Sequence, residues 1–315
     1  MKNYRKKFAV LKNGSSWLAA SGAVVTAVGM IPNSASAHGF EGDYFFPPTI
    51  TIDDPFAVDE FPFPTVSWFK SAGVSTTDIG FEFDKEIFPK FALSFAGDYL
   101  FQKPDGEPAV SGWDDFVTGA KYQLWENPEH QAIVSAGALW KIGGSGSSVV
   151  GADSANVFTP TVYYGKAFGD LPDALNYVKP LAITGTMGVD LPTSAEPNNI
   201  EWGFAVQYSL LYLQEQVKDI GLPAPFKTMI PLVEFSMTSP FNRGGGQTTG
   251  TINPGILYEN PYYQIGAEAM IPVNSATGPH VGFIFQFELF IDDVFPKVFG
   301  HPVFFGGRSA NAGAP

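Results

Sequence analysis

Residues 201–213 read EWGFAVQYSLLYL and alternate between two kinds of side chain. One parity holds large apolar residues and the other small or polar ones: Trp202, Phe204, Val206, Tyr208, Leu210 and Tyr212 against Glu201, Gly203, Ala205, Gln207 and Ser209. A strand with this pattern has one aromatic face and one polar face. The same alternation recurs along most of the chain, with too few segments to form an opposing sheet. Lipid is the simplest partner for so much apolar surface, and a sheet in lipid must close into a barrel.

The N-terminus has the organisation of a Sec-type signal peptide. A basic region contains Lys2, Arg5, Lys6, Lys7 and Lys12, and an apolar stretch follows at 18–31. The small residues of S-A-S-A at 34–37 then suit a cleavage site. We predict that residues 1–37 are removed; a single transmembrane anchor is the alternative, disfavoured by the glycines and proline that interrupt the stretch.

The mature chain is strongly acidic. Cleavage removes five of the 18 basic residues and none of the 31 acidic ones, which leaves a net charge of −18. Such a chain is not expected to bind nucleic acid. It has no cysteine, which excludes disulfides, thiolate metal sites and a lipoprotein anchor.

Twelve strands can be placed by alternation and turn residues. They are 61–70, 78–85, 91–101, 113–125, 131–141, 156–168, 175–190, 200–214, 226–238, 249–259, 262–271 and 280–292. An even number is usual for single-chain bacterial barrels. The domains expected are a signal peptide (1–37), an N-terminal periplasmic or plug segment (38–60), a barrel (61–292) and a C-terminal periplasmic tail (293–315).

The connections alternate between two kinds, which predicts sidedness. Short turns bearing proline or acidic residues lie at 85–90, 126–130, 169–174 and 260–261, with a longer one at 215–225. Longer loops rich in Gly, Ser and Thr lie between them, at 71–77, 102–112, 142–155, 191–199, 239–248 and 272–279. Outer-membrane barrels have their short turns in the periplasm, so both termini are expected there.

The strand faces predict which side chains line the lumen. The aromatic parity should face lipid, because a charged residue there would cost up to about 2–4 kcal/mol near the midplane. The opposite parity should be lumen-lining: Glu82, Asp84, Asp98, Lys121, Gln123, Glu201, Gln207, Glu234, Gln264, Glu268, Gln286 and Glu288. Most of the charged members are acidic, which predicts a preference for neutral or cationic solutes. The alternative is that these acids only solvate the interior.

Residues 38–60 combine aromatic, proline and acidic residues ahead of the first strand. This segment is expected either to plug the lumen or to lie at the periplasmic rim. Its acids match no calcium-binding loop, so we interpret them as solvated. If cleavage follows Ala37, His38 becomes the N-terminus and a candidate copper ligand, since its amine and imidazole can chelate Cu²⁺.

Catalytic and cofactor sites are not predicted. The sequence has no G-x-S-x-G motif, and only His280 falls near the outer end of a strand. The glycine runs at 143–148 and 244–246 lack the strand-to-helix context of a phosphate loop. We therefore expect a protein that is not an enzyme and needs no cofactor.

The last strand carries an assembly motif. Residues 280–287, HVGFIFQF, fit the polar-x-Gly-x-x-aromatic-x-aromatic pattern that resembles the C-terminal signal of outer-membrane barrels, although residues 288–315 follow it here. Such a signal implies recognition by the outer-membrane assembly machinery.

The hairpin around Gly119–Leu124, Asn127-Pro128 and Ser135–Gly137 also resembles a Gram-negative channel-like family associated with meta-pathway phenol degradation. The resemblance implies uptake of small, often hydrophobic molecules.

The sequence thus predicts an all-β transmembrane antiparallel up-and-down barrel of about 12 strands in the outer membrane of a Gram-negative bacterium. Its expected function is passive passage of small neutral or cationic solutes, and its expected partners are the lipid bilayer, the assembly machinery and the solute. The alternative is a closed barrel with a structural or copper-binding role through His38.

Overall fold

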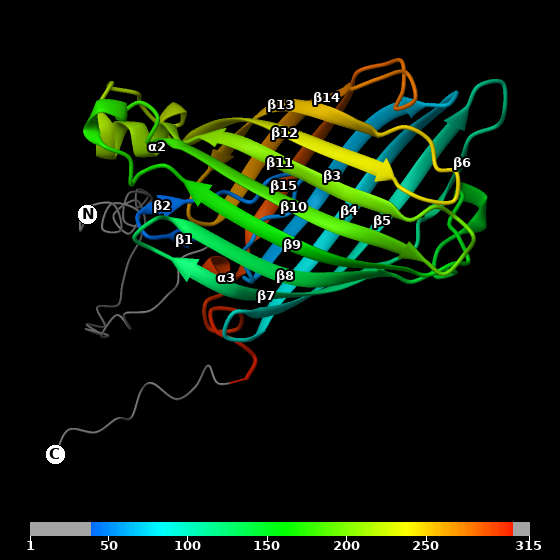
Figure 1. Ribbon diagram of the computed structural model, residues 1–315, viewed down its shortest axis with the longest axis horizontal. Helices are drawn as coiled ribbons and strands as arrows, with labels where there is room; N and C mark the ends of the chain where they lie inside the picture. The colour runs from blue at the N-terminus through cyan, green and yellow to red at the C-terminus, as the bar shows by residue number, and fades with distance from the viewer. Residues whose placement is uncertain (1–38, 305–315) are drawn as a thin grey trace, which may run out of the picture.

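The computed structural model describes residues 39–304, which form a closed antiparallel β-barrel (Figure 1). The wall strands are β3 (Glu60–Ser71), β4 (Val74–Phe88), β5 (Phe91–Pro104), β6 (Val110–Trp113), β7 (Val117–Asn127), β8 (Ala132–Lys141), β9 (Val157–Ala167), β10 (Leu181–Pro192), β11 (Asn199–Tyr208), β12 (Met229–Pro240), β13 (Thr249–Glu259), β14 (Tyr263–Pro272) and β15 (Gly282–Phe290). Both β6 and β7 pair with β5 and share one position, so the wall has twelve strands. Pairing of β15 with β3 closes the ring. The predicted twelve-stranded barrel is confirmed, whereas the predicted signal peptide and His38 lie outside the described residues.

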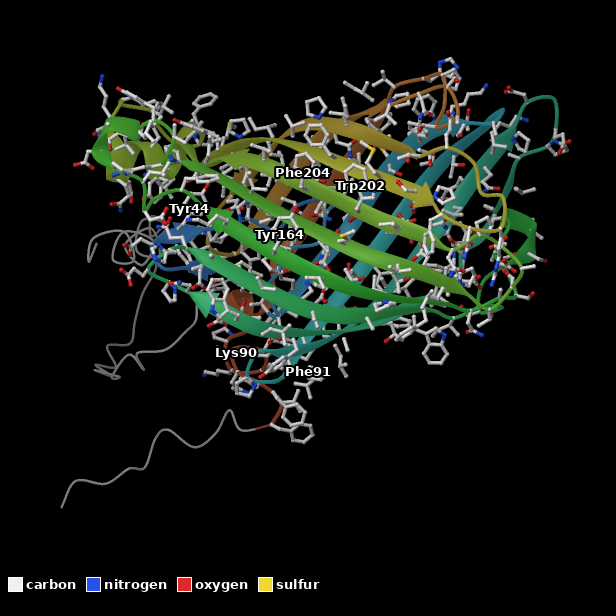
Figure 2. The ribbon with its side chains drawn as sticks, viewed as in Figure 1. Tyr44, Lys90, Phe91, Tyr164, Trp202 and Phe204 are labelled. Carbon is white, nitrogen blue, oxygen red and sulfur yellow. The ribbon has the colours of Figure 1, made fainter. Side chains whose placement is uncertain are left out.

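The outer surface of the wall is apolar and aromatic. On β11, Trp202 and Phe204 lie on the outward parity, and Tyr164 does so on β9 (Figure 2). Phe204 is paired in register with Phe235 of β12, and their rings stack with centroids 4.4 Å apart. With wall strands long enough to cross a hydrocarbon layer, this exterior is that of a membrane barrel. Among residues 39–304, no helix is both long and apolar enough to span a membrane.

Two of the sequence-based strand boundaries are wrong near the N-terminal side of the wall. The expected loop at 71–77 is a two-residue turn at Ala72 and Gly73, both of which have a positive φ, as tight hairpin turns require. The expected strand 113–125 is broken at 114–116. There Asp115 is buried, and its carboxylate accepts a hydrogen bond from Gly146 N at 2.8 Å, which fixes a loop instead of a ladder.

Two further strands are shorter than the alternation suggested. The strand expected at 175–190 begins only at Leu181, after a chain of turns that includes a 3₁₀ turn at Asp173–Leu175. The strand expected at 200–214 ends at Tyr208 and continues as α2 (Leu210–Tyr212) and a π-helical turn (Leu213–Val217). Ser209 caps this helix by accepting a hydrogen bond from Tyr212 N at 3.1 Å. Three consecutive residues, 211–213, are buried, which a strand with alternating faces cannot achieve.

The remaining short elements lie at the strand ends. They are 3₁₀ turns at Ser148–Val150 and Phe226–Thr228, the helix α3 (Ile291–Val294) and the hairpin strands β1 (Phe40–Glu41) and β2 (Tyr44–Phe45). We call the end of the barrel where β3 begins and β15 ends the terminal end, and the opposite end the loop end. The hairpin, α2 and α3 all lie at the terminal end (Figure 1).

The described part of the C-terminal tail does not extend away from the barrel. Phe304 N donates a hydrogen bond to Ile87 O at 2.9 Å, and its ring stacks on Phe88 at 5.2 Å. The ring of Phe299 contacts Phe83 at 6.1 Å. The tail therefore covers the terminal end of β4.

Candidate functional site in the lumen

The β1–β2 hairpin covers the terminal end of the barrel. Its aromatic side chains belong to two buried apolar clusters. The first contains Tyr44, Phe46, Phe56, Ile133, Ala167, Ala182 and Tyr212, and the second Phe45, Ile230, Leu232 and Leu257. Wall residues of both clusters come from β8, β9, β10, β12 and β13, so the hairpin is held from several sides. These clusters make part of this end of the lumen apolar, which parity alone did not indicate.

Residues 46–59, which we call the lumen segment, run inside the ring of strands. The segment contacts wall strands on opposite sides of the barrel. Gln264 Nε2 on β14 donates to Pro48 O at 2.9 Å, Ser135 Oγ on β8 donates to Pro55 O, and Ala57 N donates to Gln123 Oε1 on β7 at 2.9 Å. The segment therefore occupies the lumen. Hydrogen bonds attach it to the wall in addition to the apolar packing of Phe46 and Phe56 in the first cluster.

The tip of the lumen segment reaches about half the height of the wall. Ile50 N and Thr51 N donate to the two carboxylate oxygens of Glu234 at 2.8 and 2.6 Å. Glu234 is fully buried and lies near the middle of β12. Next to it, Ile52 packs over Gly203 of β11, where a Cβ would collide with its side chain. A glycine at that position lets the segment approach the wall.

On the other side of the tip, an acidic residue of the segment pairs with a lysine of the wall. Lys121 Nζ of β7 pairs with Asp53 Oδ1 at 2.7 Å and donates to Asp54 O at 2.9 Å. The same ammonium lies 4.9 Å from the centre of the Tyr163 ring. Closer to the terminal end, Asp59 pairs with Lys85 of β4. The Lys85 ammonium also donates to His301 O in the C-terminal tail at 3.0 Å. Residues 53–59 thus have one lysine partner at each end.

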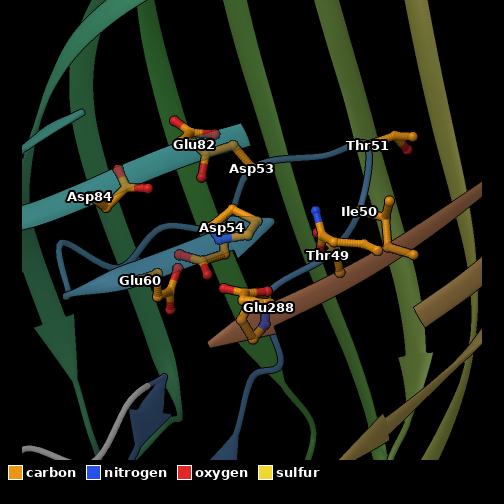
Figure 3. Close-up of a pocket in the computed structure, with 12 residues that line it drawn as sticks. Thr49, Ile50, Thr51, Asp53, Asp54, Glu60, Glu82, Asp84 and Glu288 are labelled. Carbon is orange, nitrogen blue, oxygen red and sulfur yellow. The ribbon is translucent and has the colours of Figure 1, made fainter. Parts of the chain in front are cut away.

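Beside Asp53 and Asp54 lies an acidic cavity of about 170 Å³. Six carboxylates line it: Asp53, Asp54, Glu60, Glu82, Asp84 and Glu288. Figure 3 shows Glu82 and Asp84 on one strand, β4, near Asp53 and Asp54, with Glu288 on β15, from which β4 is separated by β3. Burial raises the pKa of Asp54, and the nearby Glu60 raises it further. We name this space the acidic chamber.

All the predicted lumen residues lie on the strand faces opposite the exposed aromatic residues. Six are buried: Gln207, Glu234, Gln264, Glu268, Gln286 and Glu288. The other six are half-buried: Glu82, Asp84, Asp98, Lys121, Gln123 and Glu201. That these side chains line a path for solute stays a prediction.

The structure divides these predicted residues by role. Lys121, Gln123, Glu234 and Gln264 hydrogen-bond to the lumen segment, while Glu82, Asp84, Gln286 and Glu288 line the acidic chamber. Glu201 does neither, because its Oε2 accepts a hydrogen bond from Thr238 Oγ1 at 2.7 Å on the adjacent strand. Asp98, Gln207 and Glu268 also form no hydrogen bond to the segment within the described chain.

Several interior residues were missed by the sequence analysis. Asp54 and Asp59 were interpreted as solvated acids, yet only 4 % and 3 % of their surfaces are exposed. Tyr163, Ser135 and Asn253 are also buried in the interior. Their positions on the inward-facing parity of β8, β9 and β13 could have identified Ser135, Tyr163 and Asn253. They were missed because the analysis selected charged and amide-bearing residues on the polar faces of other strands.

The structure offers little support for a metal site. No cluster of three or more His, Asp or Glu residues within 39–304 has the arrangement of a metal site. His130 Nδ1 lies 3.0 Å from Asp170 Oδ2 at the terminal end, in an exposed pair. Burial alone would raise the pKa of Asp170, but hydrogen bonds from Lys166 and His130 and the charge of Lys166 together outweigh it, so the pKa is lowered. The copper hypothesis depends on His38, which lies outside the described residues.

Comparisons with solved structures identify the fold. An outer membrane channel from Pseudomonas putida F1 has 11 % sequence identity and a TM-score of 0.52, and the similarity covers 78 % of this chain and 99 % of that one. The NanC porin (10 % identity, TM-score 0.45, coverage 72 % and 98 %) and the KdgM porin in complex with disordered oligogalacturonate (10 %, 0.43, 71 % and 98 %) are more weakly similar.

No protein-family model and no curated protein matches this sequence. Sequence identity this low shows the fold alone. The closed wall, its apolar exterior and the structural similarity all indicate the same fold. The chain is an outer-membrane β-barrel protein with the fold of an outer-membrane channel.

Proposed function

We propose that this protein is a channel for small solutes whose lumen segment restricts passage. The observation that carries the proposal is how the segment is held. Hydrogen bonds and one ion pair attach its tip to the wall, with Glu234 and Lys121 as the main wall partners. Contacts of this kind exchange readily with water, unlike a packed apolar core.

Polar lining supports a role in transport. A barrel needed only as a stable shell could fill its interior with apolar side chains, as the two apolar clusters do locally. Around the segment tip the wall instead presents carboxylates and amides, several of them buried. Buried polar groups are costly unless partnered, and their presence in a membrane protein marks solute or ion pathways.

The acidic excess favours neutral or cationic solutes over anions. Hydrophobic solutes, which the family resemblance implies, would have to pass the apolar clusters at the terminal end. Residues 280–287 remain the proposed assembly signal, since β15 is the strand that closes the barrel against β3. Cleavage after residue 37 and a periplasmic position of the terminal end also stay part of the proposal.

Single-channel conductance in planar bilayers tests the proposal. The mature full-length chain should show small, infrequent openings, and a variant lacking residues 39–58 should show larger and more frequent ones. Heat-modifiable mobility on SDS gels must first show that both are folded. A folded deletion variant that conducts no ions would contradict a channel function.

A further inference from the structure

The barrel wall has a stretch near the terminal end where two neighbouring strands are not joined by a ladder. In the described wall, the pairing of β3 with β4 ends at Thr65 and Gly80, although β3 continues beside β15 and β4 continues beside β5. We call the stretch between β3 and β4 beyond this pair the seam. Pro62 and Pro64 of β3 have no N–H group that could donate across it. Backbone groups next to lipid must be paired, so other parts of the chain have to cover the seam.

Two groups from outside the ladder bind the edge of β4 at the seam. The carboxylate of Asp59 accepts a hydrogen bond from Glu86 N. On the same residue, Glu86 O accepts a hydrogen bond from Val303 N of the C-terminal tail at 3.2 Å, and Phe304 N donates to Ile87 O at 2.9 Å. The tail therefore supplies backbone donors where β3 no longer pairs with β4.

The tail also covers a lysine on the lipid-facing parity of β4. Lys85 is paired with Leu93 of β5, whose side chain is 43 % exposed on the outer surface. The side chain of Lys85 is only 13 % exposed. Its ammonium pairs with Asp59, donates to the carbonyl oxygens of Phe299 and His301, and lies 5.7 Å from the centre of the Phe299 ring. A lysine in contact with lipid is costly, so the tail shields a charge that the wall alone would expose.

The side of the tail that faces away from the barrel is apolar. Phe295, Val298, Val303 and Phe304 expose 52 %, 63 %, 52 % and 53 % of their surfaces. This surface is continuous with the aromatic exterior of the wall, because the ring of Phe304 stacks on Phe88. In Figure 1 the tail, in red, lies next to the cyan strands at the terminal end. Contiguous exposed apolar residues mark a contact surface, and the surface that adjoins them here is lipid-facing.

We propose that residues 295–304 of the tail are an interfacial membrane anchor, seated in the lipid leaflet at the terminal end and covering the seam. The partner is phospholipid. Its acyl chains contact Val298 and Val303, and the exposed Lys297 lies at the level of the headgroups. This position differs from the free periplasmic tail that the sequence suggested. The anchor goes beyond the proposed channel function and does not depend on conduction.

Spin labelling tests the anchor, and the absence of cysteine from the chain makes single labels specific. The mature full-length chain carrying Val298→Cys is labelled with a nitroxide and folded into phosphatidylcholine vesicles. Oxygen concentrates in lipid and a nickel chelate stays in water, so the ratio of their collision rates with the label reports its depth.

The matched control is Ile220→Cys, which is also an exposed apolar position. It belongs to the segment between β11 and β12, which lies beyond the ends of the wall strands in Figure 1. We expect the oxygen-to-nickel ratio at Val298 to be several-fold higher than at Ile220. Equal ratios would overturn the proposal and leave the apolar side of the tail as a surface for a protein partner.

A second measurement separates contact with lipid from packing on the wall. Val298→Asp adds a charge to the outer side of the tail, away from the hydrogen bonds that Val303 N and Phe304 N make to β4. With the label at Val303→Cys, Val298→Asp should lower the oxygen-to-nickel ratio several-fold, and Val298→Leu should not change it. The same ratio in both variants would show that the wall alone holds the tail, and would overturn the proposal.

Heat-modifiable mobility on SDS gels shows that each labelled protein contains a folded barrel. If Val298→Asp prevents folding, the comparison of Val298 with Ile220 still decides the proposal, because it needs only cysteines at exposed positions. Neither measurement involves conductance, so a failed anchor and a failed channel function are distinguishable.

Discussion

The lumen segment contacts two parts of the barrel wall that differ in how they surround carboxylates. Toward β12 its backbone amides are satisfied by Glu234, which accepts hydrogen bonds from Ile50 and Thr51. Toward β3, β4 and β15 its acids face other acids across the acidic chamber, with lysines only at the two ends. We infer that the β12 side anchors the segment and that the chamber side is where it can be displaced.

The difference follows from the groups that lie opposite each carboxylate. A buried carboxylate is stable when backbone N–H groups or a lysine surround it, and strongly destabilising when another carboxylate does. The same residue type therefore attaches the segment on one side and weakens its contact with the wall on the other. Three measurements would break or sharpen this comparison.

The largest effect is expected at Lys85, the partner of Asp59. Lys85→Met leaves a buried carboxylate without its cation, which costs on the order of 3–5 kcal/mol. Chemical denaturation of the folded protein in detergent measures this loss. The matched control is Lys70→Met, because the partner of Lys70, Asp105, is largely exposed, and such pairs contribute at most about 1 kcal/mol. Equal losses in the two variants would show that the chamber side is as solvated as the surface.

A smaller effect is expected at Glu234, on the anchoring side. Glu234→Ala leaves the amides of Ile50 and Thr51 without their acceptor, at a cost of about 1–3 kcal/mol for each buried donor. Hydrogen–deuterium exchange of peptides covering 48–53 should become faster, while exchange in the wall strands stays slow. Glu201→Ala is the control. Unchanged exchange in Glu234→Ala would show that the tip is held from the chamber side instead.

The smallest effect concerns pH and the β1–β2 hairpin. Burial, with a further contribution from Glu126, raises the pKa of Glu41 from 4.5 to about 7. Between these values the folded state holds more protons than the unfolded one, so stability falls as pH rises from about 4.5 to about 7. Protection of the hairpin amides against exchange, corrected for intrinsic rates, should fall over that range. Glu41→Gln should remove this dependence, and a dependence that persists would assign it to another group.

Some regions misled the sequence analysis for one physical reason. In 201–213 the alternation continues past Tyr208, yet the chain there turns into a helix because Tyr212 packs against Tyr44 of the hairpin, with ring centres 5.3 Å apart. At 71–77, polar residues typical of loops instead form part of the ladder between β3 and β4. Local patterns do not include contacts made by distant residues.

The sequence by itself determined the closed twelve-stranded wall, its aromatic exterior and its polar interior. A period of two assigns each residue to one face, and lipid permits no open sheet edge. Only the tertiary structure decided which inward residues hold the lumen segment and which form the acidic chamber. Those relations join residues far apart in sequence, such as Thr51 with Glu234 and Asp54 with Glu288, and they exist only once the ring has closed around the segment.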